Sequence, residues 1–244
     1  MSRTRSKSSV ENFRRVLYLN ISFFEIALKF AKNEAGIPDG VEEITEPARH
    51  CKMVTMARTE GDILYARADK HACMGGAWAL GLIELTESLK SGEFYFKLGT
   101  FDSWAGCMRT IKNVPRVIPP NNEGGPSTYA TVYATVYAPL EKTPFDPHVV
   151  IILAQPYQML KLGQAVLYKT GGRIESSFAG IQSVCADTAA YPYLTGKVNF
   201  SLGCDGSRKF SGIKDELMIM GIPGELLGDV ASAVPIVTDA AGSK

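Results

Sequence analysis

Five cysteines are the residues of this 244-residue sequence whose type and spacing can do chemistry. They are too few for a disulfide-built fold, and no two stand in a C-x2-C pair. Cys73 and Cys204 open similar segments, Cys73-Met-Gly-Gly and Cys204-Asp-Gly-Ser, each ahead of a predicted helix. Amides at a helix start favour a thiolate, and glycines let a bulky group approach the backbone. These segments predict a cofactor site whose further residues are Gly75, Gly76, Gly206, Ser207 and Arg208.

Four of the cysteines supply the usual number of thiolates for a four-iron, four-sulfur cluster or a structural zinc ion. The predicted metal ligands are Cys51, Cys73, Cys185 and Cys204. Two other interpretations stay open, since free cysteines are often small buried hydrophobes and a thiolate can also be a nucleophile. Cys107 lies among apolar residues in WAGCMR, and we expect it to pack in a core.

Other chemical motifs are weaker. The segment 203–209 (GCDGSRK) could form a small anion-binding nest with Arg208 and Lys209, or a plain turn between strand and helix. His50 adjoins Cys51, but adjacent helical positions point in different directions. His71 could ligate or orient a bound group near Cys73, or lie on a solvent-facing turn. The sequence contains no phosphate-binding glycine motif and no G-x-S-x-G elbow.

Hydrophobic periodicity predicts alternating helices and strands, which indicates an α+β fold with helices packed on a mixed sheet. The continuous apolar run 149–154 (VVIILA) predicts a central, fully buried strand. The predicted strands are 26–31, 63–67, 94–98, 129–140, 149–154 and 197–202. The predicted helices are 10–18, 49–59, 73–90, 101–112, 156–169 and 225–233, with further helical structure starting at Ser207 or Lys214.

The two halves of the chain contain cysteines at similar spacings and similar glycine-containing turns. Cys51 precedes Cys73 by 22 positions and Cys185 precedes Cys204 by 19, and the second cysteine of each pair opens a C-x-G-small turn. We interpret this as an old duplication, with half-units at about 10–118 and 128–237 of one domain spanning 10–237. Chance matching of short glycine-containing segments is the alternative. Residues 1–9 are expected to form a flexible basic tail, and residues 238–244 to fray.

The charge is nearly balanced, with 26 basic and 25 acidic side chains, which argues against a general nucleic-acid binder. The apolar stretch 16–30 follows a basic segment but is interrupted by polar residues and is too short to span a membrane. We therefore expect a cytoplasmic protein with reduced thiols and no membrane partner. Expected partners are a small molecule or metal cofactor, and further copies of the chain in a homo-oligomer.

The sequence resembles an uncharacterised prokaryotic family, the domain of unknown function numbered 169, which is frequent in archaea and anaerobic bacteria. The resemblance covers about residues 25 to 232 and rests on IALKFA with IPDGVEE, HCKMVTMAR (50–58), CMGGAWALGL (73–82), the stretch 146–162, SVCAD (183–187) and SLGCDGSR (201–208). It implies a single family unit and supplies no activity. The association with anaerobes favours an oxygen-sensitive metal site over disulfides. Tyr157 and Gln158 depart from the pattern expected after Pro156.

The leading functional hypothesis is a metal- or cofactor-binding protein with a redox-accessory role, holding an iron–sulfur cluster, or zinc, through the four cysteines. An alternative is an enzyme acting on a small anionic substrate, with Cys73 or Cys204 as nucleophile and Arg208 as anion clamp. A third is a non-catalytic interaction or assembly protein, in which the tyrosine-rich strand 129–137 lies at a sheet edge or subunit contact.

Overall fold

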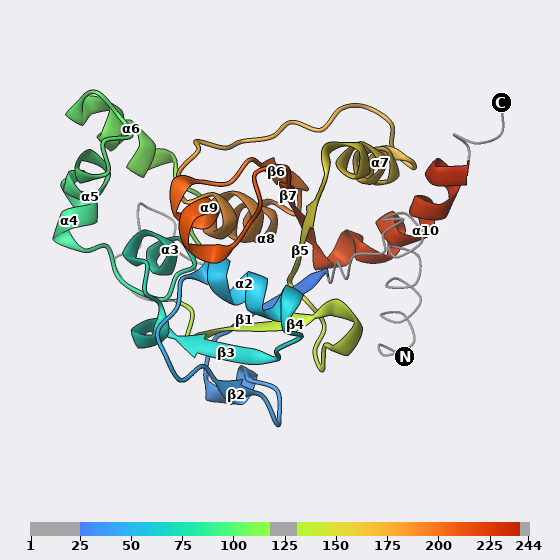
Figure 1. Ribbon diagram of the computed structural model, residues 1–244, viewed down its shortest axis with the longest axis horizontal. Coiled ribbons are helices and arrows are strands. Elements are labelled where there is room, and N and C mark those ends of the chain that lie inside the picture. The colour runs from blue at the N-terminus through green and yellow to red at the C-terminus, as the bar shows by residue number, and fades with distance from the viewer. Residues whose placement is uncertain (1–24, 118–130, 240–244) are drawn as a thin grey trace.

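The computed structural model describes residues 25–117 and 131–239, and within them the strands form one mixed sheet (Figure 1). The strand order is β2-β3-β4-β1-β5-β7-β6. Neighbours are antiparallel except β2 and β3, which are parallel. The strands are β1 (Ile26–Ala31), β2 (Glu42–Glu43), β3 (Leu64–Arg67), β4 (Ala134–Pro139), β5 (Val149–Ala154), β6 (Asn199–Ser201) and β7 (Met218–Pro223). The expected α+β fold with a mixed sheet is confirmed.

The centre of the sheet is the antiparallel pair of β1 and β5, in which Ile26 lies opposite Ile151. Successive strand side chains point to opposite faces, so an uninterrupted apolar strand needs cover on both sides. Val149, Ile151 and Leu153 belong to one core, whereas Val150, Ile152 and Ala154 belong to another. The prediction of a central, fully buried strand at 149–154 is therefore confirmed.

Helices cover both faces of the sheet. The helices α2 (His50–Thr59), α3 (Met74–Ala79) and the π-helix η4 (Ser183–Ala190) supply the first core, and α7 (Pro156–Leu167) with α10 (Leu227–Asp239) supply the second. The short helices α8 (Tyr191–Thr195) and α9 (Asp205–Ser211) lie on the side of η4 (Figure 1). The 3-10 turns are η1 (Glu34–Gly36), η2 (Ala68–Lys70), η3 (Leu140–Lys142) and η5 (Gly224–Leu226).

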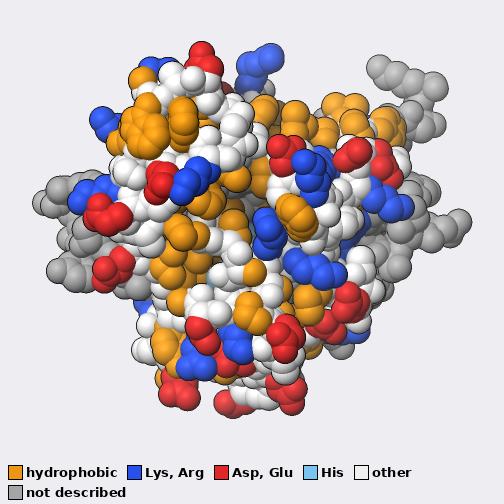
Figure 2. Space-filling model, turned by 60° about the vertical axis from the view of Figure 1, so that its left-hand side comes forward, with side chains coloured by type: hydrophobic (Ala, Val, Ile, Leu, Met, Phe, Trp, Pro, Cys, Tyr) orange, Lys and Arg blue, Asp and Glu red, His pale blue; other side chains and the backbone are white. Residues whose placement is uncertain are grey.

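A third, smaller core lies at one end of the molecule, under α4 (Glu87–Lys90), α5 (Glu93–Lys97) and α6 (Trp104–Asn113) (Figure 1). Cys107 is fully buried there with Trp78 and Tyr95, so its expected packing role is confirmed. On the outside of this end, the large apolar side chains of Phe96, Leu98 and Trp104 are exposed. Figure 2 shows hydrophobic side chains on this side of the molecule, among interspersed positive and negative charges.

The single helix predicted over 73–90 is wrong. Helix α3 ends at Ala79, and α4 begins only at Glu87. Gly81 adopts a φ of +78°, and a Cβ there would lie 2.6 Å from the Val117 carbonyl oxygen. The backbone of Gly81 also accepts hydrogen bonds from Thr131 and Val132. The close approach of the β4 segment therefore turns the chain out of the helix at this glycine.

Three other local predictions need correction. Residues 94–97 belong to helix α5 (Glu93–Lys97) and not to a strand, and Gly92, in a left-handed conformation, immediately precedes this helix. Strand β4, within the tyrosine-rich segment, lies between β3 and β1 and is not a sheet edge. Strand β7 falls where helical structure was expected. Its Gly221 lies so close to η4 that a Cβ would overlap the Thr188 carbonyl, a tertiary contact that local periodicity does not contain.

The expected basic tail at 1–9 and the predicted helix at 10–18 lie outside the described residues. Helix α10 continues to Asp239, two residues into the segment expected to fray. Across the described residues, no helix is both long and apolar enough to traverse a bilayer.

Candidate functional site

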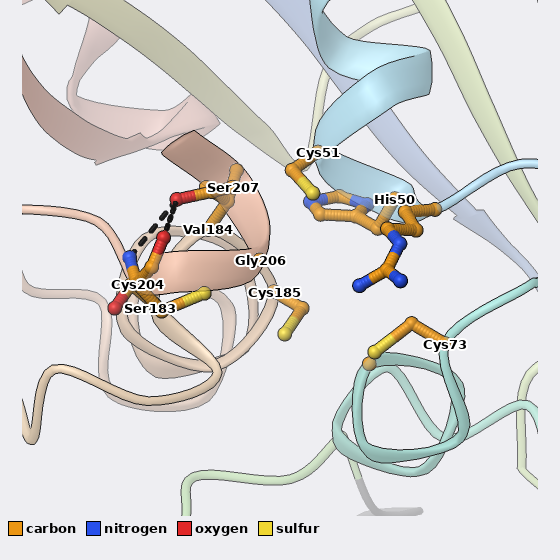
Figure 3. Close-up of a pocket in the computed structure, with 11 residues that line it drawn as sticks. His50, Cys51, Cys73, Ser183, Val184, Cys185, Cys204, Gly206 and Ser207 are labelled. Carbon is orange, nitrogen blue, oxygen red and sulfur yellow. Dashed lines mark hydrogen bonds between the residues drawn. The ribbon is translucent and has the colours of Figure 1, made fainter. Parts of the chain in front are cut away.

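Four cysteines line one pocket on the face of the sheet covered by α2, α3 and η4 (Figure 3). Counting its open mouth, the pocket encloses about 330 Å³ of space free of protein atoms. The four are Cys51, Cys73, Cys185 and Cys204, which span 154 positions of the sequence numbering. The fold thus gathers all four predicted ligands at one place, and Figure 3 shows their side chains around a common space. All five cysteines of the chain are free thiols.

Each of the four sits at the start of a helix. Cys51 is the second residue of α2 and Cys185 the third residue of η4. Cys73 and Cys204 immediately precede α3 and α9, in similar extended conformations. The two C-x-G-small segments therefore have the same local structure, as their sequences predict. First-turn N–H groups lack partners within the helix and commonly bind anionic groups.

Ser207 holds the Cys204 backbone in place. Its hydroxyl accepts a 2.9 Å hydrogen bond from the Cys204 N–H and donates one of 2.7 Å to the Cys204 carbonyl. Both partners lie at the first turn of α9, and Ser207 itself is fully buried. The predicted role of Ser207 at the site thus takes the form of a support for a cysteine in the pocket wall.

Two glycines leave room between the sulfur atoms. A Cβ on Gly76 would lie 3.6 Å from the Sγ of Cys73 and 3.7 Å from the Sγ of Cys185. A Cβ on Gly206 would lie 3.9 Å from the Sγ of Cys204. The absence of side chains at these positions therefore opens the space that the thiols surround.

Burial keeps two of these thiols protonated. It raises the pKa of Cys51 to about 11, an effect partly opposed by the Ser211 hydroxyl. It also raises the pKa of Cys185 well above its ordinary value, and the neighbouring cysteines contribute in the same direction. Ser211 donates a 2.8 Å hydrogen bond to the Cys51 Sγ. A metal that binds these sulfurs must displace their protons.

A buried polar network lies beneath the pocket. Nδ1 of His50 lies 2.7 Å from the Tyr137 hydroxyl, which donates to Thr135 Oγ1 at 3.0 Å. His71 reaches the same threonine through Nε2 at 3.0 Å. Burial lowers the pKa of His50 to about 3 and that of His71 to about 4, so both rings are neutral near pH 7. His71 is buried and does not lie on a solvent-facing turn.

A buried carboxyl group follows Cys185 on η4. The Ser201 hydroxyl donates a 2.8 Å hydrogen bond to Oδ2 of Asp187. Burial nevertheless raises the pKa of Asp187 to about 7. This side chain therefore titrates near neutral pH.

The structure does not bring every predicted site residue to the pocket. Gly75 lies beside it, against the Phe94 ring, and its carbonyl accepts a hydrogen bond from Gln182. The Arg208 guanidinium donates to the Leu217 carbonyl at 2.8 Å and to the carbonyls of Leu202 and Lys214. These bonds tie Arg208 to the backbone on both sides of α9. Gly76, Gly206 and Ser207 do line the pocket.

Sequence reasoning assigned no role to several residues that line the pocket. Arg49 packs its guanidinium 4.2 Å above the Phe210 ring, and its Nη1 lies beside Gly206. Its position two residues before Cys51 was the available signal. His50 was noted only as a neighbour of Cys51. Ser183 and Val184 also line the pocket, at the start of η4.

As they stand, the thiols do not form a site for one metal ion. Among the described residues, no three His, Cys, Asp or Glu side chains lie close enough together to hold such an ion. A tetrahedral zinc site with zinc–sulfur bonds of about 2.3 Å needs its sulfurs about 4 Å apart.

The fold and the site thus define a class of α+β proteins in which four cysteines line one pocket. The sequence profile of the domain of unknown function 169, described as uncharacterised ArCR, matches residues 17–233, and the chain belongs to this family. The chain is 42% identical over 210 residues to the uncharacterized protein MJ0308 of Methanocaldococcus jannaschii. That match covers 86% of this chain and 85% of the relative. No solved structure matches the chain significantly.

Proposed function

We propose that the chain binds an iron–sulfur cluster, or a related metal group, through Cys51, Cys73, Cys185 and Cys204. One observation carries the proposal: four of five cysteines, from four separate segments, surround a single pocket. Two of them open matching glycine-containing turns, and glycines line the space between the sulfurs. Thiolates are the protein ligands that iron–sulfur clusters require.

The spacing of the thiols favours a cluster over a lone zinc ion. A cluster carries its ligands on several iron atoms and so tolerates sulfurs further apart than one tetrahedral ion does. The pocket also opens to the surface, which gives iron and sulfide a route of entry. Zinc binding would require the cysteine-bearing segments to move inward.

A cluster in this pocket would suit electron transfer. Four thiolates with a cluster carry net negative charge, and the half-buried Arg49 at the pocket wall is positioned to balance part of it. A redox-accessory role follows from this chemistry, in a reducing cytoplasm that keeps the thiols free.

We further infer that the site lies between two halves related by duplication. In chain order, the first half has β1, Cys51 on α2, β3, Cys73 before α3, and β4. The second half has β5, Cys185 on η4, β6, Cys204 before α9, and β7. The sheet orders β3-β4-β1 and β5-β7-β6 mirror each other about the antiparallel β1–β5 pair, as a two-fold axis there requires. Each half would supply two ligands.

Anaerobic reconstitution tests the proposal. The chain is incubated with ferrous iron and sulfide without oxygen, desalted, and its visible absorption recorded. A brown chromophore with iron and sulfide bound in nearly equal numbers is expected. A colourless, metal-free, stably folded chain whose stability is unchanged by Cys73→Ala and Cys204→Ala would refute it.

An enzyme acting on a small anionic substrate is the second candidate. Arg49 favours it, because its guanidinium lines the cysteine pocket, where the expected clamp Arg208 does not reach. Cys73 or Cys204 would then be the nucleophile. Thiol-specific labelling across pH separates the two candidates: one cysteine that reacts unusually fast at neutral pH supports the enzyme, and uniformly slow labelling counts against it.

A further inference from the structure

A strained backbone position lies beside the cysteine pocket. Gln182 has a φ of +53°, and in the described parts of the chain no other residue except glycine adopts a positive φ. A glutamine is uncommon in this left-handed region, and such strain persists where surrounding contacts enforce it, often at functional sites. Gln182 immediately precedes η4, which carries Cys185, and its carbonyl accepts a 2.7 Å hydrogen bond from the Ala186 N–H. The strained residue therefore determines how this helix begins.

The side chain of Gln182 joins η4 to two other helices. It is only 5% exposed. Its Nε2 donates to the Gly75 carbonyl in α3, and its Oε1 accepts from the Tyr95 hydroxyl in α5. Gly75 follows Cys73 by two positions. The amide of Gln182 thus connects the segment that carries Cys185 with the segment that carries Cys73.

A corresponding contact joins the other two cysteine segments. Arg49 immediately precedes α2, and its Nη1 would lie 3.2 Å from a Cβ on Gly206. The Nε2 of Gln182 would likewise lie 3.2 Å from a Cβ on Gly75. Both glycines follow a pocket cysteine by two positions. In each case, the residue before one cysteine-bearing helix reaches a glycine turn in the other half of the chain, where a side chain would crowd it.

Glycine would adopt the backbone conformation of Gln182 without strain, but it would supply neither side-chain hydrogen bond. We propose that Gln182 is a positioning residue, whose amide holds Cys185 and Cys73 at one space so that both thiols can bind the same group. A Cβ on Gly76 would lie 3.6 Å from the Cys73 Sγ and 3.7 Å from the Cys185 Sγ, so both sulfurs flank that space. Gln182 does not itself line the pocket and acts through these cysteines. Where it concerns metal retention, this inference rests on the proposed function.

Gln182→Met is the informative variant, because methionine has a similar length but lacks the amide. The matched control is Gln158→Met. Gln158 is also a buried glutamine, and its Oε1 accepts a 2.8 Å hydrogen bond from the Gln155 N–H at the start of α7, on the opposite face of the sheet. The chains are reconstituted with iron and sulfide, and iron loss to a chelator is followed. Contacts that orient metal ligands are typically worth tenfold or more in affinity, so Gln182→Met should lose iron about tenfold faster, and Gln158→Met at the rate of the unmodified chain.

Gln182→Gly separates positioning from backbone strain. It relieves the strain and removes the amide, so it should lose iron as fast as Gln182→Met. Normal iron retention in Gln182→Gly would show that the residue only shapes a turn, and would overturn the inference. Tyr95→Phe removes one partner of the amide and leaves Gln182 in place. It is the milder variant should Gln182→Met fail to fold, and it should lose iron faster than Gln158→Met.

Cross-linking tests the same placement without metal. The metal-free chain is treated with dibromobimane, which joins two nearby thiols, and the product that links Cys73 to Cys185 is measured by mass spectrometry. This product is expected from the unmodified chain and Gln158→Met, and should be largely lost in Gln182→Met. Equal yields from all three, or no such product from the unmodified chain, would overturn the inference. An unmodified chain that gives the product but binds no iron would refute the proposed function and leave the positioning role standing.

Discussion

The Ser211 hydroxyl donates a 2.8 Å hydrogen bond to the Cys51 sulfur, although the two residues are 160 positions apart. Cys51 lies at the start of α2 and Ser211 at the end of α9, the helix that follows Cys204. The backbone of Ser211 also accepts a 2.7 Å hydrogen bond from Thr55 on α2. Hydrogen bonds therefore connect α2 directly to α9, and so join the parts of the pocket wall that come from the first and second halves of the chain.

Ser211→Ala should lower the free energy of unfolding of the metal-free chain by about 1 kcal/mol, the usual worth of one buried hydrogen bond. Urea denaturation under reducing conditions measures it. Ser232→Ala, which removes a hydrogen bond on the exposed face of α10, is the control and should change stability less. An equal effect of both variants would show that the link between α2 and α9 adds nothing.

Gly76→Ala should separate stability from metal loading. Alanine is favoured over glycine in a helix by up to about 1 kcal/mol, and the new Cβ makes only ordinary contacts in the empty pocket. The metal-free chain should therefore be as stable or slightly more stable, whereas loading should fall because the methyl group occupies the space between Cys73 and Cys185. Gly228→Ala on α10 is the matched control, since a Cβ there meets no atom within 4 Å. Normal loading of Gly76→Ala would place the metal group elsewhere.

Metal affinity should rise with pH. The raised pKa values of Cys51 and Cys185 mean that both thiols are protonated at neutral pH and release protons when they bind metal. Each released proton strengthens apparent binding up to about tenfold per pH unit below the thiol pKa. Incorporation of iron and sulfide during anaerobic reconstitution at pH 6.5, 7.5 and 8.5 should show this trend. A flat profile would mean that these two thiols are not ligands.

Asp187→Asn should stabilise the metal-free chain at pH 8. The pKa of Asp187 is about 7 in the folded chain and near 3.8 in a free side chain. The protonated Asp187 side chain therefore favours the folded chain fully below pH 3.8, and this contribution to the free energy of unfolding is lost as the pH rises through 7. The difference in unfolding free energy between the variant and the unmodified chain should grow over this interval, by at most a few kcal/mol. Taking the difference removes the opposite contributions of His50 and His71, whose pKa values are lowered. A constant difference would contradict the raised pKa.

The sequence predicts the fold best where the hydrophobic pattern within one segment determines the secondary structure of that segment. Strands β1 and β5 match their predicted bounds. The continuous apolar segment of β5 needs burial on both faces, and β1 is apolar except at the partly buried Lys29. The errors fall where a distant segment decides the local structure. Gly81 ends α3 because the β4 segment packs against it, and Gly221 allows η4 to lie on β7. Neither contact leaves a periodic signal in the sequence.

The candidate site was predictable in its residue types but not in its full composition. The similar turns at Cys73 and Cys204 predict paired positions, and the structure places both at one pocket. Arg49 and His50 were missed because they line the pocket only through the way in which the first turn of α2 is oriented in the fold. Arg208 was included because it adjoins a glycine turn, yet backbone carbonyls of the neighbouring loop hold its guanidinium.

Metal analysis of single-cysteine variants tests the central claim most directly. The unmodified chain and five variants, each with one cysteine replaced by alanine, are purified without oxygen, and iron, acid-labile sulfide and zinc are measured per chain. We predict iron and sulfide in the unmodified chain and in Cys107→Ala, and a large loss of both in the variants at Cys51, Cys73, Cys185 and Cys204. Equal metal content in all six proteins, or none in the folded unmodified chain, would contradict the account.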